Sequence, residues 1–198
     1  MNNSFTRQIL RCAAFIVLLA PTSKAVDGNM ATPKEIAVGM RAPAFTLKDQ
    51  NDREFSLETM VSKGTVAVVF IRSIDWCTYC QLQTVQLSQN LPEIQAGGGQ
   101  VVMVCYDAPN KVKRFTQRRK ISIPVLSDAD SKTIDAYAMR ALKDGGDQGG
   151  SSQHGTFIID KSGIVRAKPY LTSFEGRSAV DALVNALKEA SKETEPKP

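Results

Sequence analysis

Two cysteines separated by two residues are the feature of this sequence with the clearest chemistry. Cys77 and Cys80 follow residues 65–71, an apolar run typical of a buried strand, and precede residues 81–91, which have helical spacing. The first cysteine of such a pair lies at a helix start, where free backbone N–H groups and the helix dipole favour a thiolate. We therefore expect Cys77 to be the nucleophile and Cys80 to resolve a mixed disulfide.

Three side chains beside the pair could adjust its reactivity. Trp76 could shield the sulfur of Cys77 and offer an apolar docking surface. The two residues between the cysteines bring no cation, so a lowered thiol pKa would have to come from the helix end and from neighbours. Arg72 and Asp75 flank the motif and could tune it electrostatically.

Two residues distant in sequence could also reach this site. His154 is the only histidine of the chain. We expect it to lie close to Cys77 and to tune it: when protonated it would stabilise the Cys77 thiolate, and when neutral it could accept the proton of that thiol or share a metal ion with its sulfur. Cys105 ends the apolar run 101–106 and is most simply a small buried residue, although a resolving or metal-binding role stays open.

A metal site is the main alternative to redox chemistry for these side chains. Zinc takes four ligands, a number that Cys77, Cys80, Cys105 and His154 would supply together. A CxxC pair directly after a buried strand is more often redox-active, so we expect no cofactor other than a Cys77–Cys80 disulfide.

The amino terminus predicts export. Arg7 and Arg11 precede residues 12–20, an apolar run too short to span a bilayer, and small residues follow up to Ala25. We expect residues 1–25 to be a signal peptide cleaved near Ala25, with an uncleaved anchor as the alternative. Cleavage would lower the basic residues from 25 to 22 against 20 acidic ones, so the net charge would fall from +5 to +2. This balance does not predict a nucleic-acid partner.

The remaining chain predicts one α/β domain at residues 36–190, between a flexible lead-in at 26–35 and a disordered tail at 191–198. Two buried runs joined by a helix should be parallel neighbours, and two expected hairpins make the central sheet mixed, with helices flanking it. The carboxyl ends of parallel strands meet at one edge, where the cysteines should lie. The expected strands are 45–47, 55–57, 65–71, 101–106, 123–126, 156–159 and 164–168, and the expected helices are 81–91, 111–120, 130–142 and 178–190, with a glycine-rich loop at 144–152.

Several segments resemble the redoxins of the alkyl hydroperoxide reductase/thiol-specific antioxidant (AhpC/TSA) family. These segments are residues 39–49 (GMRAPAFTLKD), 70–80, 101–107, 124–128 and 155–160, and the match runs from about residue 36 to residue 190. The resemblance implies a thioredoxin-like fold and thiol chemistry on small peroxides or on protein disulfides, with an unidentified thiol reductant. The tryptophan before the CxxC is more similar to the periplasmic thioredoxin-like branch, which handles disulfides.

The sequence departs from the family pattern at two places. Peroxidatic members carry a Pro-x-x-x-Thr-x-x-Cys motif, and with Cys80 at its cysteine, Ser73 takes the place of the proline and Cys77 that of the threonine. The disulfide branch has a cis-proline three residues before a late phenylalanine, where this chain has His154. Copper-delivery proteins of this fold also pair two cysteines with a histidine, but their spacing is CxxxC.

The sequence thus predicts an exported, periplasmic thiol–disulfide oxidoreductase without a stable membrane anchor. One alternative is a thiol peroxidase in which Cys77 or Cys80 attacks a hydroperoxide. The other is a copper or zinc protein that uses Cys77, Cys80 and His154.

Overall fold

The computed structural model describes residues 35–141, 151–171 and 177–192, which all belong to one compact unit, Thr32–Pro198. The expected signal peptide, all but the last residue of the lead-in, and most of the glycine-rich loop and of the polar tail lie outside the described residues. Within the described part of the chain, no helix is long and apolar enough to cross a membrane.

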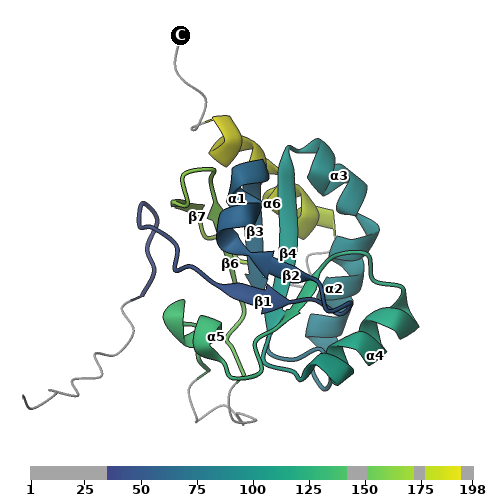
Figure 1. Cartoon of the computed structure of the whole chain (residues 1–198). Helices are drawn as coiled ribbons and strands as arrows, with labels where there is room; N and C mark the ends of the chain where they lie inside the picture. Colours follow the sequence, from purple (N-terminus) through teal and green to yellow (C-terminus); the bar gives the residue numbers. More distant parts are fainter. Residues whose placement is uncertain (1–34, 142–150, 172–176, 193–198) are drawn as a thin grey trace, which may run out of the picture. The chain divides into compact units, whose positions relative to one another are not determined.

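A mixed sheet forms the centre of this unit (Figure 1). Its strands in chain order are β1 (Thr46–Lys48), β2 (Glu54–Ser56), β3 (Thr65–Phe70), β4 (Gly99–Cys105), β5 (Val125–Ser127), β6 (Gly155–Ile159) and β7 (Val165–Ala167). Their order across the sheet is β2-β1-β5-β4-β3-β6-β7. Strands β3, β4 and β5 are parallel neighbours, whereas the hairpins β1–β2 and β6–β7 join by antiparallel pairing. The expected α/β fold with a mixed central sheet is confirmed.

Helices cover both faces of the sheet. They are α1 (Leu57–Lys63), α2 (Thr78–Gln89), α3 (Leu91–Ala96), α4 (Pro109–Arg119), α5 (Lys132–Ala136) and α6 (Arg177–Lys192). Side chains of β3 alternate between two apolar clusters: Ala67 and Val69 pack with α2, α3, α4 and α6, and Val66 and Val68 pack with α1 and α5. Because β3 is buried on both faces, it reads as a continuous apolar run.

The helices differ from the expected ones in their number and in their bounds. Helix α1 was not expected; its N-terminus is capped by the Ser56 hydroxyl, which accepts the N–H of Thr59. Helix α2 begins three residues earlier than expected, and Pro92 lies in the first turn of α3, where a proline needs no backbone donor. Helix α5 is short, and the left-handed backbone of Ala138 follows soon after its end. Helix α6 continues to Lys192.

Candidate active site

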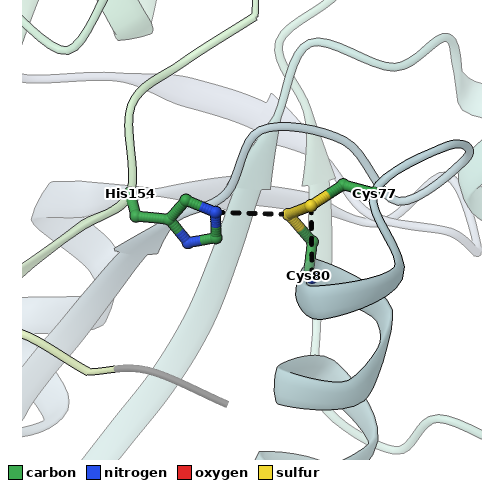
Figure 2. Close-up of side chains that lie close together, drawn as sticks. All are labelled: Cys77, Cys80 and His154. Carbon is green, nitrogen blue, oxygen red and sulfur yellow. Dashed lines mark hydrogen bonds between the residues drawn. A yellow bond between two sulfur atoms is a disulfide. The ribbon is translucent and has the colours of Figure 1, made fainter. Parts of the chain in front are cut away.

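The two cysteines lie at the start of α2, in the segment that follows the carboxyl end of β3. Cys77 is the N-cap residue of this helix, and its Sγ accepts a hydrogen bond from the backbone N–H of Cys80 at 3.3 Å. Cys77 and Cys80 are joined by a disulfide (Figure 2). Cys77 is 4% exposed and Cys80 is fully buried. A partner thiol or disulfide can therefore reach Cys77 more easily than Cys80.

The imidazole of His154 points toward the disulfide from the segment that leads into β6, across from the start of α2 (Figure 2). Strand β6 runs antiparallel to β3 with Gly155 opposite Phe70, so the residue before Gly155 lies beside the segment that follows β3. His154 lies close to the pair, as expected, with its ligand nitrogen within 4.8 Å of both sulfur atoms. Its direct contact is with Cys80 rather than Cys77, because Nε2 is 3.6 Å from the Sγ of Cys80. Residues 74 positions apart in sequence thus meet because of strand pairing.

The environment of His154 favours the neutral imidazole. Burial lowers its pKa, and the positive charge of Arg72 lowers it further. Of the roles open to this residue, stabilisation of a thiolate by an imidazolium is therefore disfavoured near neutral pH. A neutral imidazole next to Cys80 can accept the proton of that thiol.

Trp76 forms part of the surface beside Cys77. The guanidinium of Arg72 lies over its ring, 4.8 Å from the centroid, and its indole N–H donates to the Tyr106 hydroxyl at 2.9 Å. The side chain remains 37% exposed. Arg72 and Tyr106 thus hold an apolar ring in place next to Cys77. The sequence had given no indication of the role of Tyr106.

Asp75 connects this loop to α4. Its carboxylate forms ion pairs with Lys111 at 2.9 Å and with Arg114 at 2.8 Å. The hydrogen bond from Lys111 is the main cause that lowers the pKa of Asp75. Because two cations balance its charge, Asp75 adds little negative potential at Cys77, and its contribution is to orient the loop.

Asp107 is a buried carboxylate that the sequence analysis did not assign. It follows β4 by two residues and accepts hydrogen bonds from the Ser73 hydroxyl at 2.8 Å and from the backbone N–H of Ile74 at 2.7 Å. The Ser73 hydroxyl oxygen in turn accepts the N–H groups of Asp75 and Trp76. This network fixes the loop that leads into the cysteine pair. Its only signal in the sequence is an aspartate at the end of a buried strand.

The sequence of this chain matches a known protein family over most of the described domain. Residues 38–168 match the AhpC/TSA family. The chain belongs to the AhpC/TSA family. The described part of this AhpC/TSA member has the thioredoxin-like fold, and as a member it is an oxidoreductase.

Curated relatives of this AhpC/TSA member include both disulfide and peroxide enzymes. The thiol-disulfide oxidoreductase ResA of Geobacillus thermodenitrificans is 28% identical over 163 residues, which cover 81% of this chain and 85% of the relative. Alkyl hydroperoxide reductase E of Mycobacterium tuberculosis is 30% identical over 129 residues, 65% of this chain and 82% of the relative. Among solved structures, peroxidoxin BcpB from Mycobacterium tuberculosis matches with a TM-score of 0.67 at 20% identity, over 78% of this chain and 98% of that one. This last likeness shows the fold alone.

The contribution of the buried Ser73 hydrogen bonds to the stability of this AhpC/TSA member can be measured. Replacing Ser73 with alanine removes a donor to buried Asp107 and an acceptor for two backbone N–H groups. We expect Ser73→Ala to lower the free energy of unfolding by about 1–3 kcal/mol, because a buried charged acceptor loses a partner. Chemical denaturation followed by circular dichroism measures this loss.

Ser122→Ala is the matched control for that experiment, because the Ser122 hydroxyl makes its hydrogen bonds to Ser88 at an exposed position. It should change stability by less than about 0.5 kcal/mol. Equal losses in the Ser73 and Ser122 variants would contradict a special role for the buried network.

Cys105 does not join the group formed by the other site residues. It is fully buried, and burial together with the charge of Asp107 raises its thiol pKa well above the ordinary value. Among the described residues, Cys77, Cys80 and His154 form a group of potential metal ligands that does not include Cys105. The four-ligand zinc set considered as an alternative is therefore not assembled, because Cys105 lies in the buried core cluster.

A cavity of about 480 Å³ borders His154, and β6 and the segment after β7 form part of its wall. Its walls include Tyr137, Met139, Lys168 and Tyr170 as well as His154. Tyr170 is 69% exposed at this cavity. The imidazole therefore lies between the disulfide and a space that a small molecule or water can enter.

Proposed function

We propose that this protein is an exported thiol–disulfide oxidoreductase that works through Cys77 and Cys80. The observation that carries the proposal is the disulfide at the start of α2, with Cys77 as its N-cap and Cys80 against the imidazole of His154. Free N–H groups at a helix start lower the cost of a thiolate there. The proposed partners are protein thiols or disulfides, and a thiol reductant returns the pair to its reduced form.

The exchange begins at Cys77 in the reduced protein. Its thiolate attacks one sulfur of a partner disulfide, which forms a mixed disulfide and releases the first partner sulfur as a thiolate that takes up a proton. Cys80 then gives its proton to His154 and attacks the sulfur of Cys77. This step releases the second partner thiolate, so the partner gains two electrons and the Cys77–Cys80 disulfide forms.

Peroxide reduction is the second candidate, because relatives of this chain are named as peroxide enzymes. In the peroxidatic arrangement the proline and threonine positions correspond to Ser73 and Cys77. Cys77 brings a sulfur and no hydroxyl to the threonine position, and the Ser73 hydroxyl at the proline position is bound to Asp107 and to two loop N–H groups, so neither side chain rebuilds the peroxide pocket. The geometry therefore supports disulfide exchange better than rapid peroxide reduction.

The relative rates of the two reactions test the proposal. We expect the reduced protein to react with hydrogen peroxide slowly and without saturation, and to reduce a protein disulfide such as that of insulin much faster. Trp76, the only tryptophan of the chain, lies next to Cys77, so stopped-flow fluorescence can follow oxidation of the pair directly. The Cys105→Ala variant, which keeps the pair and lacks the buried thiol, should behave as the unaltered protein.

A fast, saturating oxidation by hydrogen peroxide that one cysteine substitution abolishes would contradict the expected order of the two rates, in which disulfide reduction is faster. The peroxidase function would then be the better description. Failure of both reactions in a protein whose two thiols are shown to be reduced would contradict thiol redox function as a whole.

The proposal places the working protein in the periplasm. It includes residues 1–25 as a signal peptide cleaved near Ala25, a lead-in at 26–35, the redox domain at 36–190 and a tail at 191–198. No cofactor other than the disulfide is required, because the electrons pass between sulfur atoms. The proposed partners do not include nucleic acid.

A further inference from the structure

We propose that the reduced protein holds one thiophilic d¹⁰ cation, Cu⁺ or Zn²⁺, between Cys77, Cys80 and His154. The Sγ atoms of the two cysteines and a ring nitrogen of the histidine all lie within 4.8 Å of one another (Figure 2). Thiolate sulfur combined with imidazole nitrogen is a donor set that soft and borderline cations prefer. This site needs no partner disulfide, so it does not depend on the proposed exchange reaction.

The spacing of His154 and Cys80 already matches that of two ligands of one metal ion. With metal–sulfur and metal–nitrogen bonds of about 2.3 and 2.05 Å, tetrahedral ligands lie about 3.6 Å apart. The distance from Nε2 of His154 to Sγ of Cys80 is 3.6 Å. Half of the ligand geometry is therefore present before any side chain moves.

Cys77 completes the set once the disulfide is reduced. Two thiolate ligands of one tetrahedral ion are about 3.8 Å apart, so the two sulfurs must separate beyond bonding distance. Cys77 precedes α2 as its N-cap, outside the first full helical turn, and rotation of its side chain can provide this separation. The helix itself, which carries Cys80, does not have to move.

The surroundings allow an ion to enter. Both sulfurs belong to nearly buried residues, which limits competition from water, but the cavity of about 480 Å³ begins at His154. A water molecule or a donor from a partner can occupy the remaining coordination position from that side. Arg72, held over the Trp76 ring, adds one positive charge near two thiolates. With Cu⁺ the charges of the ion, the thiolates and Arg72 sum to zero, whereas Zn²⁺ leaves one positive charge.

Metal binding and disulfide formation exclude each other at this site. Oxidation of the two thiols removes two electrons and two protons and joins the sulfur atoms that the ion needs. Metal binding to the reduced pair instead releases the thiol protons and leaves both sulfurs unoxidised. The redox state of the pair therefore decides whether the ion is held.

Competition titrations of the purified protein test the inference. The reduced protein is titrated with Zn²⁺ against a chromogenic chelator and, separately, without oxygen, with Cu⁺ against a copper(I) chelator. We expect one equivalent of at least one of these ions to bind, and the oxidised protein to bind none. Whichever ion competes successfully identifies the cation.

Four variants separate this site from a simple dithiol. Cys80→Ser and His154→Ala should each weaken binding by about 100-fold or more, since each removes a direct ligand, and loss of a residue that only hydrogen-bonds to a ligand already costs about 10–100-fold. Cys105→Ala should bind as the unaltered protein, because Cys105 lies outside the ligand group. His154→Gln provides a second test of the imidazole, and circular dichroism verifies that each variant is folded.

Two results would overturn the inference. One is that the fully reduced protein binds neither ion more tightly than Cys80→Ser. The other is that His154→Ala and His154→Gln bind as tightly as the unaltered protein, which would leave only the two thiols as ligands. Neither result affects the exchange function, which is measured with partner disulfides and no added metal.

Discussion

Replacing Cys77 with serine should abolish disulfide exchange, with the rate of insulin reduction falling by about 1000-fold or more. A hydroxyl is not ionised near neutral pH and cannot form the mixed disulfide, so the variant lacks the first covalent step. Cys77 is also the more exposed residue of the pair, and the helix start favours its anion. The measurement is the initial rate of insulin reduction with a thiol reductant in excess.

Cys80→Ser is the informative partner of that variant. It keeps the nucleophile but removes the resolving thiol, so the mixed disulfide with the partner should accumulate instead of turning over. Mass spectrometry of the trapped species then identifies the partner protein. If Cys77→Ser accumulated the mixed disulfide and Cys80→Ser did not, the two roles would be reversed.

Replacing His154 with alanine should slow the resolving step by about 100-fold, the lower end of what a positioned acid–base group contributes. Its Nε2 lies 3.6 Å from the Cys80 sulfur, and the sequence contains no second histidine that could take over its role. The step is measured by rapid mixing of the reduced protein with a small disulfide, followed by quenching and analysis of the mixed disulfide.

The pH profile distinguishes proton transfer from a structural effect of His154. Burial and the charge of Arg72 lower the imidazole pKa below its usual value near 6.5, so the base stays neutral and active as the pH falls from 8 through about 6.5. Its contribution should disappear only when the pH falls through the lowered pKa. In His154→Ala the resolving rate should instead fall with falling pH over this whole range, because only the small deprotonated fraction of the Cys80 thiol can then react.

Gln153→Ala is the control, since Gln153 is exposed and its side-chain amide donates to the backbone oxygen of Arg140, away from the cysteine pair. It should keep both the rate and the profile of the unaltered protein. Parallel pH profiles for the unaltered protein and His154→Ala would show that the imidazole does not accept the Cys80 proton.

Local patterns in the sequence were enough for much of the fold. The apolar run that became β3 is buried along its whole length, and the β1–β2 hairpin turns at Asp52, which has a positive φ of 61°. The CxxC follows β3 at the start of a helix, as its position predicted. These features depend on side-chain periodicity and turn chemistry within about ten residues, so one stretch of sequence contains the signal.

Helix boundaries were less predictable because they depend on caps and on neighbouring elements. The helix expected at residues 81–91 stops before Pro92, but in the structure Pro92 lies in the first turn of a further helix, α3. Leu82 fits a helical apolar spacing, but its side chain is 54% exposed because the buried side of α2 is formed by Cys80, Gln83, Thr84 and Leu87. Periodicity alone does not reveal which face of a short helix meets the sheet.

The chemistry beyond the cysteine pair was decided by the tertiary structure. Sequence alone identified Cys77 and Cys80 as a reactive pair, but strand pairing placed His154 against Cys80 and left Cys105 in the core. The contact of Asp107 with Ser73 spans 34 residues and has no periodic signal. A carboxylate or an imidazole acquires its function from what surrounds it, through burial, charge and hydrogen bonds, and those surroundings exist only after the strands have paired.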